Sequence, residues 1–162
     1  MTGLAEFNAL PEAEARERLA RCLGVPRWID TVLAGRPYAD VRALRAVASN
    51  AADLDPTELE VALAGHPRIG ERAGEGHDRA FSAAEQSAVD RDDADVAARL
   101  AAGNRAYEER FDRVFLIRAA RRDTHEILTE LERRLGQDEA AEREETVNQL
   151  REIALLRLEQ VV

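Results

Sequence analysis

Apolar residues recur three and four positions apart along most of the chain, a spacing that places them on one face of a helix. The first such stretch, residues 11–23, stops before Gly24 and Pro26, two residue types that commonly end helices. Comparable stretches follow it nearly to residue 162. They predict helices that bury Ala15, Leu19, Cys22, Leu23, Trp28, Val32, Val41, Leu44, Val47, Ala48, Ile127, Leu128, Leu131, Leu135, Val147, Leu150, Ala154, Leu158 and Val161.

Other signals place the ends of two of the predicted helices. Asp55 and Glu58 have the spacing of a capping box, and a proline stands at the first helical position between them. This helix is expected to end at Gly65. A longer helix is expected over residues 82–111, with a break near Gly103.

One apolar run lacks helical spacing. The run "RVFLIRAA", residues 113–120, is compact, and its period does not distinguish a strand from another kind of buried segment. No repeats or low-complexity linkers appear, and strand signals are nearly absent. The prediction is an all-α fold, with residues 1–162 forming a single-domain bundle of about seven to nine helices and one extended apolar segment near 113–120.

Two absences narrow the chemistry. All 23 basic residues are arginine, so no lysine is available to hold pyridoxal phosphate as a Schiff base. Cys22 is the only cysteine, which excludes thiolate zinc sites, iron–sulfur clusters and internal disulfides, and we expect it to be a buried structural thiol. The three histidines lack metal-ligand spacing, so no catalytic metal is predicted.

Charge and hydropathy limit the partners. The formal net charge is −9, and no uncompensated stripe of arginines is visible, so a nucleic-acid partner is not expected. No apolar run approaches the roughly 18 residues of a membrane span, and the chain starts with neither a basic nor an apolar leader. We therefore expect a soluble, cytoplasmic protein without membrane contact.

The stretch "AGHPRIGERAGEG", residues 64–76, places His66 between a glycine and a proline. The proline favours extended backbone at His66, and the glycines mark a loop. His66 is either a solvent-facing loop residue or an acid–base group, because the unperturbed pKa of histidine, about 6.5, lies near cellular pH. A place just beyond a helix C-terminus would favour the charged imidazolium. His77 and His125 are expected to be exposed.

Two further places break the helical pattern. The motif "SAAEQ", residues 82–86, is either a capping box formed by Ser82 and Glu85 or a helix N-terminus whose free backbone N–H groups bind an anionic ligand. Both interpretations hold if the cap also presents Glu85 and Gln86 to a pocket. Arg157 lies inside the apolar stripe of the last helix. Such an arginine is expected to extend to solvent by default, and the alternative is a pair with a carboxylate.

Together these motifs resemble the OHCU decarboxylases, which act on 2-oxo-4-hydroxy-4-carboxy-5-ureidoimidazoline in urate degradation. The resemblance covers nearly the whole chain, and the order and spacing of the motifs make it specific. The motifs are "FNALP" near the start, "HPRIG" at 66–70, "SAAEQ" at 82–86, "NRAYEERF" at 104–111, the "VFLIRAA" segment, and "EIALLRL" in the final helix. The resemblance implies an all-α, cofactor-free, homodimeric carboxy-lyase that forms (S)-allantoin from its small-molecule substrate.

The resemblance also implies site residues. His66 matches the catalytic general acid–base of the family, and Glu85 matches its acid partner. The other matches are substrate-binding positions. They comprise the residues Pro67, Ser82, Gln86 and Arg157, and a backbone strip at Phe115, Ile117 and Ala119 that pairs with the ureido and ring amides.

Three positions depart from the family pattern. Asp112 and Arg121 stand where the family commonly has glycine, and Arg118 stands where a small residue or cysteine is frequent. The residues matched to the chemistry are unaffected. The departures keep open a family member that acts on a related ureido or imidazoline substrate. A non-catalytic helical interaction module is the alternative from another class.

Overall fold

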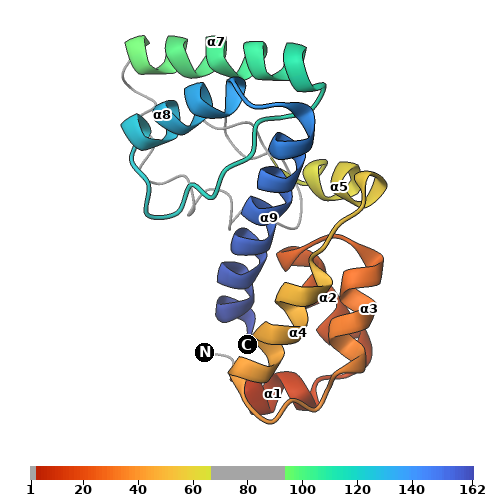
Figure 1. The fold of residues 1–162 in the computed structure, drawn as a ribbon. Coiled ribbons are helices and arrows are strands. Elements are labelled where there is room, and N and C mark those ends of the chain that lie inside the picture. The colour runs from red at the N-terminus through yellow and green to blue at the C-terminus, as the bar shows by residue number, and fades with distance from the viewer. Residues whose placement is uncertain (1–2, 67–93) are drawn as a thin grey trace. The chain divides into compact units, whose positions relative to one another are not determined.

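The computed structural model of the chain describes residues 3–66 and 94–162, which form helices and connecting segments without a strand (Figure 1). The predicted all-α fold is therefore confirmed for this part of the chain. The helices are α1 (Leu4–Ala9), α2 (Glu12–Cys22), α3 (Pro26–Ala34), α4 (Val41–Ala51), α5 (Pro56–Leu63), α7 (Ala94–Phe111), α8 (Thr124–Leu135) and α9 (Glu139–Val161).

Most of the predicted core positions are buried in the helices that carry them. Leu19 of α2, Leu44 of α4 and Leu131 of α8 are each exposed by 1% or less. Val41 is an error of the prediction, because its side chain is 44% exposed. It is the first residue of α4, directly after the N-cap Asp40, and its side chain faces solvent although it has the spacing of a core residue.

The capping box predicted at the start of α5 is confirmed. The Glu58 N–H donates to Asp55 Oδ1 at 2.8 Å, and the Asp55 N–H donates to Glu58 Oε1 at 3.1 Å. The two reciprocal bonds satisfy backbone donors that the first turn of a helix leaves without partners. α5 therefore begins where the sequence predicts.

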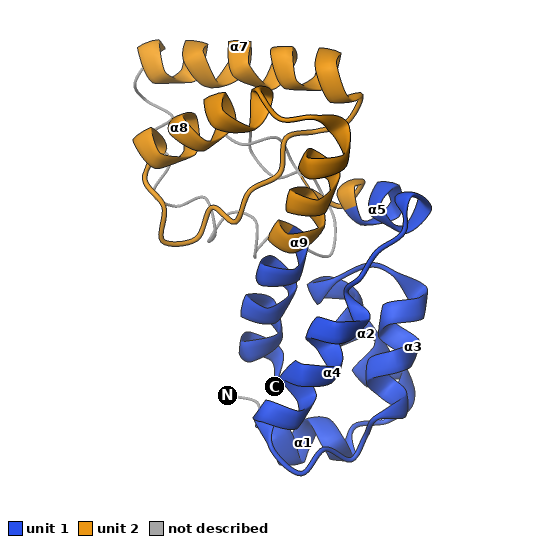
Figure 2. Cartoon of the chain, in the orientation of Figure 1, with its two compact units in different colours: residues 1–62, 150–162 blue, residues 63–149 orange. Residues whose placement is uncertain are grey.

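The chain divides into two compact units (Figure 2). Unit 1 comprises residues 1–62 and 150–162 and holds α1 to α4, most of α5 and the C-terminal half of α9. Unit 2 comprises residues 63–149 and holds α7, α8 and the N-terminal half of α9. A single domain over the whole chain stays a prediction.

In unit 1, the side chains of Trp28 and Arg151 donate hydrogen bonds to carbonyls at the C-terminal end of α4. Trp28 of α3 donates from Nε1 to the Ala48 carbonyl at 2.9 Å. Arg151 of α9 donates from Nε to the Ser49 carbonyl at 3.0 Å and from Nη2 to the Ala52 carbonyl at 3.4 Å. Because the last carbonyls of a helix have no partner within the helix, these bonds fix α4 against α3 and α9.

In unit 2, α7 packs against α8 around an apolar core. The predicted break near Gly103 is wrong, since α7 runs through this residue. A Cβ atom on Gly103 would lie 2.3 Å from Leu131 Cδ2, so glycine permits the two helices to approach closely. The core residues are Leu100, Tyr107, Phe111, Phe115, Ile117, Ala119, Ile127, Leu128 and Leu131.

Candidate active site

His66 lies three residues beyond the end of α5, where its backbone N–H donates to the Leu63 carbonyl at 3.0 Å. The residue is half-buried. The sequence correctly placed it just past a helix C-terminus. His125, in the first turn of α8, is exposed as predicted. The other residues predicted in this part of the site, Pro67, Ser82, Glu85 and Gln86, lie outside the described residues, as does His77.

The apolar segment 113–120 connects α7 to α8 and is neither helix nor strand, which confirms that it departs from the helical pattern. Phe115, Ile117 and Ala119 are buried, with exposures of 0%, 2% and 4%. The ring of Phe115 meets the ring of Tyr107 edge to face, with centroids 5.2 Å apart. The guanidinium of Arg134 also lies over the Phe115 ring, 4.7 Å from its centroid. The segment is therefore a packed part of unit 2.

Two side chains bind the backbone of this segment. Arg134 of α8 donates from Nη1 to the Leu116 carbonyl at 2.6 Å. The Arg118 N–H donates to Gln149 Oε1, on α9, at 2.8 Å. Within residues 3–66 and 94–162, the backbone N–H and C=O groups of Phe115 and Ile117 have no hydrogen-bond partner. Buried backbone groups of this kind are rare in folded proteins, so these four call for a partner.

Arg134 belongs to a buried polar network that was not predicted from the sequence. Arg134 Nε donates to Glu142 Oε1 at 2.9 Å, and both side chains are 0% exposed. The same carboxylate oxygen accepts from Tyr107 Oη at 2.6 Å, and Arg134 Nη2 donates to Thr146 Oγ1 at 3.2 Å. Burial, followed by the Glu142 hydrogen bond, raises the pKa of Tyr107 to about 12, so the phenol remains a donor at neutral pH. Gln137 donates to the other oxygen of Glu142 at 2.8 Å.

A signal for this network was present in the sequence. Arg134 follows Ile127 and Leu131 at helical spacing, so it occupies the apolar face of its helix. Arg157 was singled out on the same ground. Both arginines occupy apolar positions of the helical pattern, and both are buried and hydrogen-bonded.

The segment begins and ends with left-handed backbone. Asp112 has φ of 54° and Arg121 has φ of 65°. The Asp112 N–H donates to the Glu108 carbonyl at 2.9 Å, which is the αL motif that closes many helices. Glycine is the residue best suited to such backbone. The two departures from the family's glycines thus fall on the two non-glycine residues with positive φ in the described part of the chain.

Arg157 lies in unit 1 and is 2% exposed, so the default expectation that it extends to solvent is wrong. Its Nη1 donates to the Arg21 carbonyl at 3.2 Å, at the end of α2, which offers the guanidinium a half-buried acceptor. Cys22, the next residue along α2, is 1% exposed. Burial raises the pKa of its thiol to about 12, which confirms the predicted structural thiol.

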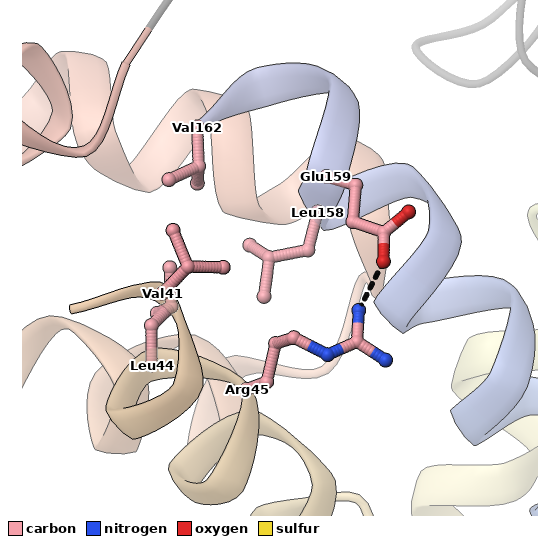
Figure 3. Close-up of a pocket in the computed structure, with 6 residues that line it drawn as sticks. All are labelled: Val41, Leu44, Arg45, Leu158, Glu159 and Val162. Carbon is pink, nitrogen blue, oxygen red and sulfur yellow. Dashed lines mark hydrogen bonds and ion pairs between the residues drawn. The ribbon is translucent and has the colours of Figure 1, made fainter.

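A pocket in unit 1 contains none of the predicted site residues (Figure 3). Its lining is mainly apolar, and an ion pair between Arg45 and Glu159 borders it. The residues that line it are Val41, Leu44, Arg45, Leu158, Glu159 and Val162. It offers neither a histidine nor an unpaired carboxylate for proton chemistry.

Two absences hold for the residues that the structure describes. They contain no group of three or more histidine, cysteine or carboxylate side chains arranged to hold a metal ion. Their helices also include none with both the length and the apolar character that crossing a membrane requires.

Two solved structures share the fold. A crystal structure of OHCU decarboxylase in the presence of (S)-allantoin superposes with a TM-score of 0.73, at 19% identity, over 90% of this chain and 96% of that one. A crystal structure of (S)-allantoin synthase also gives a TM-score of 0.73, at 15% identity, over 99% of this chain. The present chain spans 54% of the latter's length.

The sequence matches agree with the fold. The family model described as OHCU decarboxylase matches residues 8–159, a range that includes His66, the 113–120 segment and Arg157. A 2-oxo-4-hydroxy-4-carboxy-5-ureidoimidazoline decarboxylase from Amia calva is 33% identical over 138 residues, which cover 81% of this chain and 77% of that protein. These matches define a carboxy-lyase, an enzyme rather than a non-catalytic interaction module. The chain belongs to the OHCU decarboxylase family.

Proposed function

We propose that this protein decarboxylates 2-oxo-4-hydroxy-4-carboxy-5-ureidoimidazoline to (S)-allantoin, without a cofactor, in urate degradation. The observation that carries the proposal is the family match over residues 8–159, which includes both His66 and the 113–120 segment. The relative from Amia calva is named for this substrate. The lack of lysine agrees with a reaction that needs no pyridoxal phosphate.

The substrate supplies its own electron sink. Its carboxylate lies beta to a ring imine, so the electron pair of the breaking carbon–carbon bond moves into the C=N group as carbon dioxide leaves. The product of this step is an enediamine, which then takes one proton at carbon. The protein has to exclude water from the carboxylate, stabilise the developing charge and deliver the proton to one face.

We assign that proton to His66, as general acid–base. Its half-buried position and the backbone bond to Leu63 support this role, because they hold the residue partly away from solvent on a fixed turn. Glu85 is proposed to orient and polarise His66 or the substrate hydroxyl. A general acid–base pair of this kind contributes on the order of 10² to 10⁴ in rate. Protonation from one side yields (S)-allantoin rather than the racemate.

The substrate is proposed to bind along the backbone strip of Phe115, Ile117 and Ala119. The ureido group and the ring amides carry both donors and acceptors, which match backbone C=O and N–H groups. Support comes from Phe115 and Ile117, whose backbone groups are buried and lack partners among the described residues. The residues proposed to complete the substrate site are Pro67, Ser82, Gln86 and Arg157.

The family resemblance adds three expectations. The protein is expected to be a homodimer, to be cytoplasmic, and to consist of one domain over residues 1–162. No nucleic-acid partner is expected, because the net charge is −9.

Circular dichroism of the freshly generated urate-oxidation product tests the function. The substrate decays spontaneously to racemic allantoin, so a fast signal of the (S) sign in the presence of the protein measures enzymatic turnover. His66→Ala should abolish this signal, whereas His125→Ala, at an exposed histidine of α8, should retain it. No signal above the spontaneous course would refute the proposed reaction. Stereoselective turnover by folded His66→Ala would refute the role of His66.

A further inference from the structure

We propose that Gln149 and Arg134 are positioning residues, which hold the 113–120 segment from one side so that its opposite backbone edge can bind the substrate. The inference rests on the proposed function. It assigns to these two residues a part in substrate binding, although neither is proposed to touch the substrate.

Side chains of α8 and α9 already occupy two backbone groups of the 113–120 segment. The bonds from Arg134 to Leu116 and from Arg118 to Gln149 engage alternate residues of the segment. Residues 114–119 are neither helix nor strand, and we take this stretch as extended backbone, in which the N–H and C=O groups of neighbouring residues point to opposite sides. The bound groups of residues 116 and 118 therefore define one edge, and the groups of Phe115 and Ile117 belong to the other.

The first of these two hydrogen bonds, from Arg134 to the Leu116 carbonyl, is held rigidly. The Arg134 guanidinium also donates to Glu142 and Thr146, and it lies over the ring of Phe115. Because its planar donors are held in fixed directions by these partners, the bond to the Leu116 carbonyl has little freedom to move. The network therefore fixes the segment relative to α8 and to the N-terminal half of α9.

The second hydrogen bond, from the Arg118 N–H to Gln149, is not part of such a network. Gln149 is half-buried, and the hydrogen bond from the Arg118 N–H is the one that the structure gives its side chain within the described residues. Its amide oxygen can be removed without creating a buried charge. Gln149 is therefore the better residue for a test, whereas a change at Arg134 disturbs the whole network.

The test measures steady-state kinetics by circular dichroism for the unchanged protein and for three variants. Gln149→Leu removes the acceptor, Gln149→Glu retains an acceptor oxygen, and Asn8→Leu is the matched control. Asn8 exchanges two 2.9 Å hydrogen bonds with the backbone of Tyr38, in unit 1, so its loss also removes bonds between a side-chain amide and backbone. Melting temperatures show how far each change lowers stability.

We expect Gln149→Leu to raise KM about threefold to tenfold with kcat little changed, since one hydrogen bond that orders the binding edge is lost. Gln149→Glu should keep KM within about twofold of the unchanged protein, and so should Asn8→Leu, even where its melting temperature falls as far. An unchanged KM in Gln149→Leu would overturn the inference. An equal rise in Asn8→Leu would also overturn it, because general destabilisation would then explain the effect.

Amide hydrogen exchange separates this inference from the proposed reaction. Added (S)-allantoin should slow exchange at Phe115 and Ile117 in the unchanged protein and in Gln149→Glu, but much less in Gln149→Leu. Protection that is lost in Gln149→Leu, without turnover by the unchanged protein, would refute the proposed reaction and support the positioning role. Turnover with equal protection in Gln149→Leu would refute the positioning role alone, and the absence of both turnover and protection would refute both.

Discussion

Replacing Arg134 with methionine removes the cation of the buried pair in unit 2 and keeps a long apolar side chain in its place. The carboxylate of Glu142 would remain, with hydrogen bonds from Tyr107 and Gln137 but without its cation. The Leu116 carbonyl would also lose its donor. Arg134 and Glu142 are both 0% exposed, so water cannot replace what is lost without opening the core.

The expected loss is large because the remaining charge is buried. Removing one partner of a buried ion pair typically lowers the free energy of unfolding by about 3–5 kcal/mol. For a chain of this size, each 1 kcal/mol corresponds to about 2–4 °C in the melting temperature. Arg134→Met is therefore expected to melt about 6–20 °C below the unchanged protein.

Arg133→Met is the matched control, since it makes the same substitution one residue earlier on α8. Arg133 pairs with Glu130 and Glu145, but its side chain is 47% exposed, and surface pairs of this kind are worth less than about 1 kcal/mol. Thermal unfolding at pH 7, followed by circular dichroism, compares the two variants. A loss in Arg134→Met no larger than that in Arg133→Met would show that the network contributes no more than a surface pair.

Two further predictions concern the backbone and the thiol. Arg121→Gly should raise the free energy of unfolding by about 0.5–1 kcal/mol, because glycine adopts the φ of 65° without strain. The control Arg105→Gly, on the exposed face of α7, should lower the free energy of unfolding by about 1 kcal/mol. Changes of the same sign in the two variants, measured by urea unfolding, would refute this explanation. Cys22, whose pKa burial raises from 9.0 to about 12, should resist a thiol reagent at pH 8 until urea unfolds the chain. Since the folded pKa is the higher one, the unfolded chain loses the proton first, and the stability linked to this thiol should be intact below about pH 9 and fall as the pH rises toward 12.

Helical spacing predicted most of the fold, because a buried helix face imposes a period that single residues rarely disturb. Leu19 and Leu131 are examples, since both are on predicted faces and both are buried. Val41 is an exception, since it has the spacing of a core residue but is 44% exposed. Another error arose at a glycine, where the period carries no information. Gly103 was expected to break a helix, but it is inside α7 because Leu131 requires the space that a side chain would fill.

The candidate site was less predictable from spacing. The roles of Glu85 and Ser82 rest on the family resemblance, since a capping box explains the same motif equally well. The network around Glu142 was missed because a charged residue counts as polar in any hydrophobic pattern, and its partner Arg134 becomes adjacent to it only when α8 and α9 pack together. Arg134 itself continues the apolar spacing of Ile127 and Leu131, but its pairing with Glu142 leaves no such trace in one sequence.

The departures from the family pattern bear on the rival substrate. Asp112 and Arg121 occupy positive-φ positions at the two ends of the 113–120 segment, so this chain follows there the backbone path that favours glycine. The replacements raise the energy of that path without requiring a different one. Arg118, the third departure, donates from Nη1 to the Ala120 carbonyl at 2.7 Å, within its own segment. None of the three departures by itself therefore requires a substrate other than the family's.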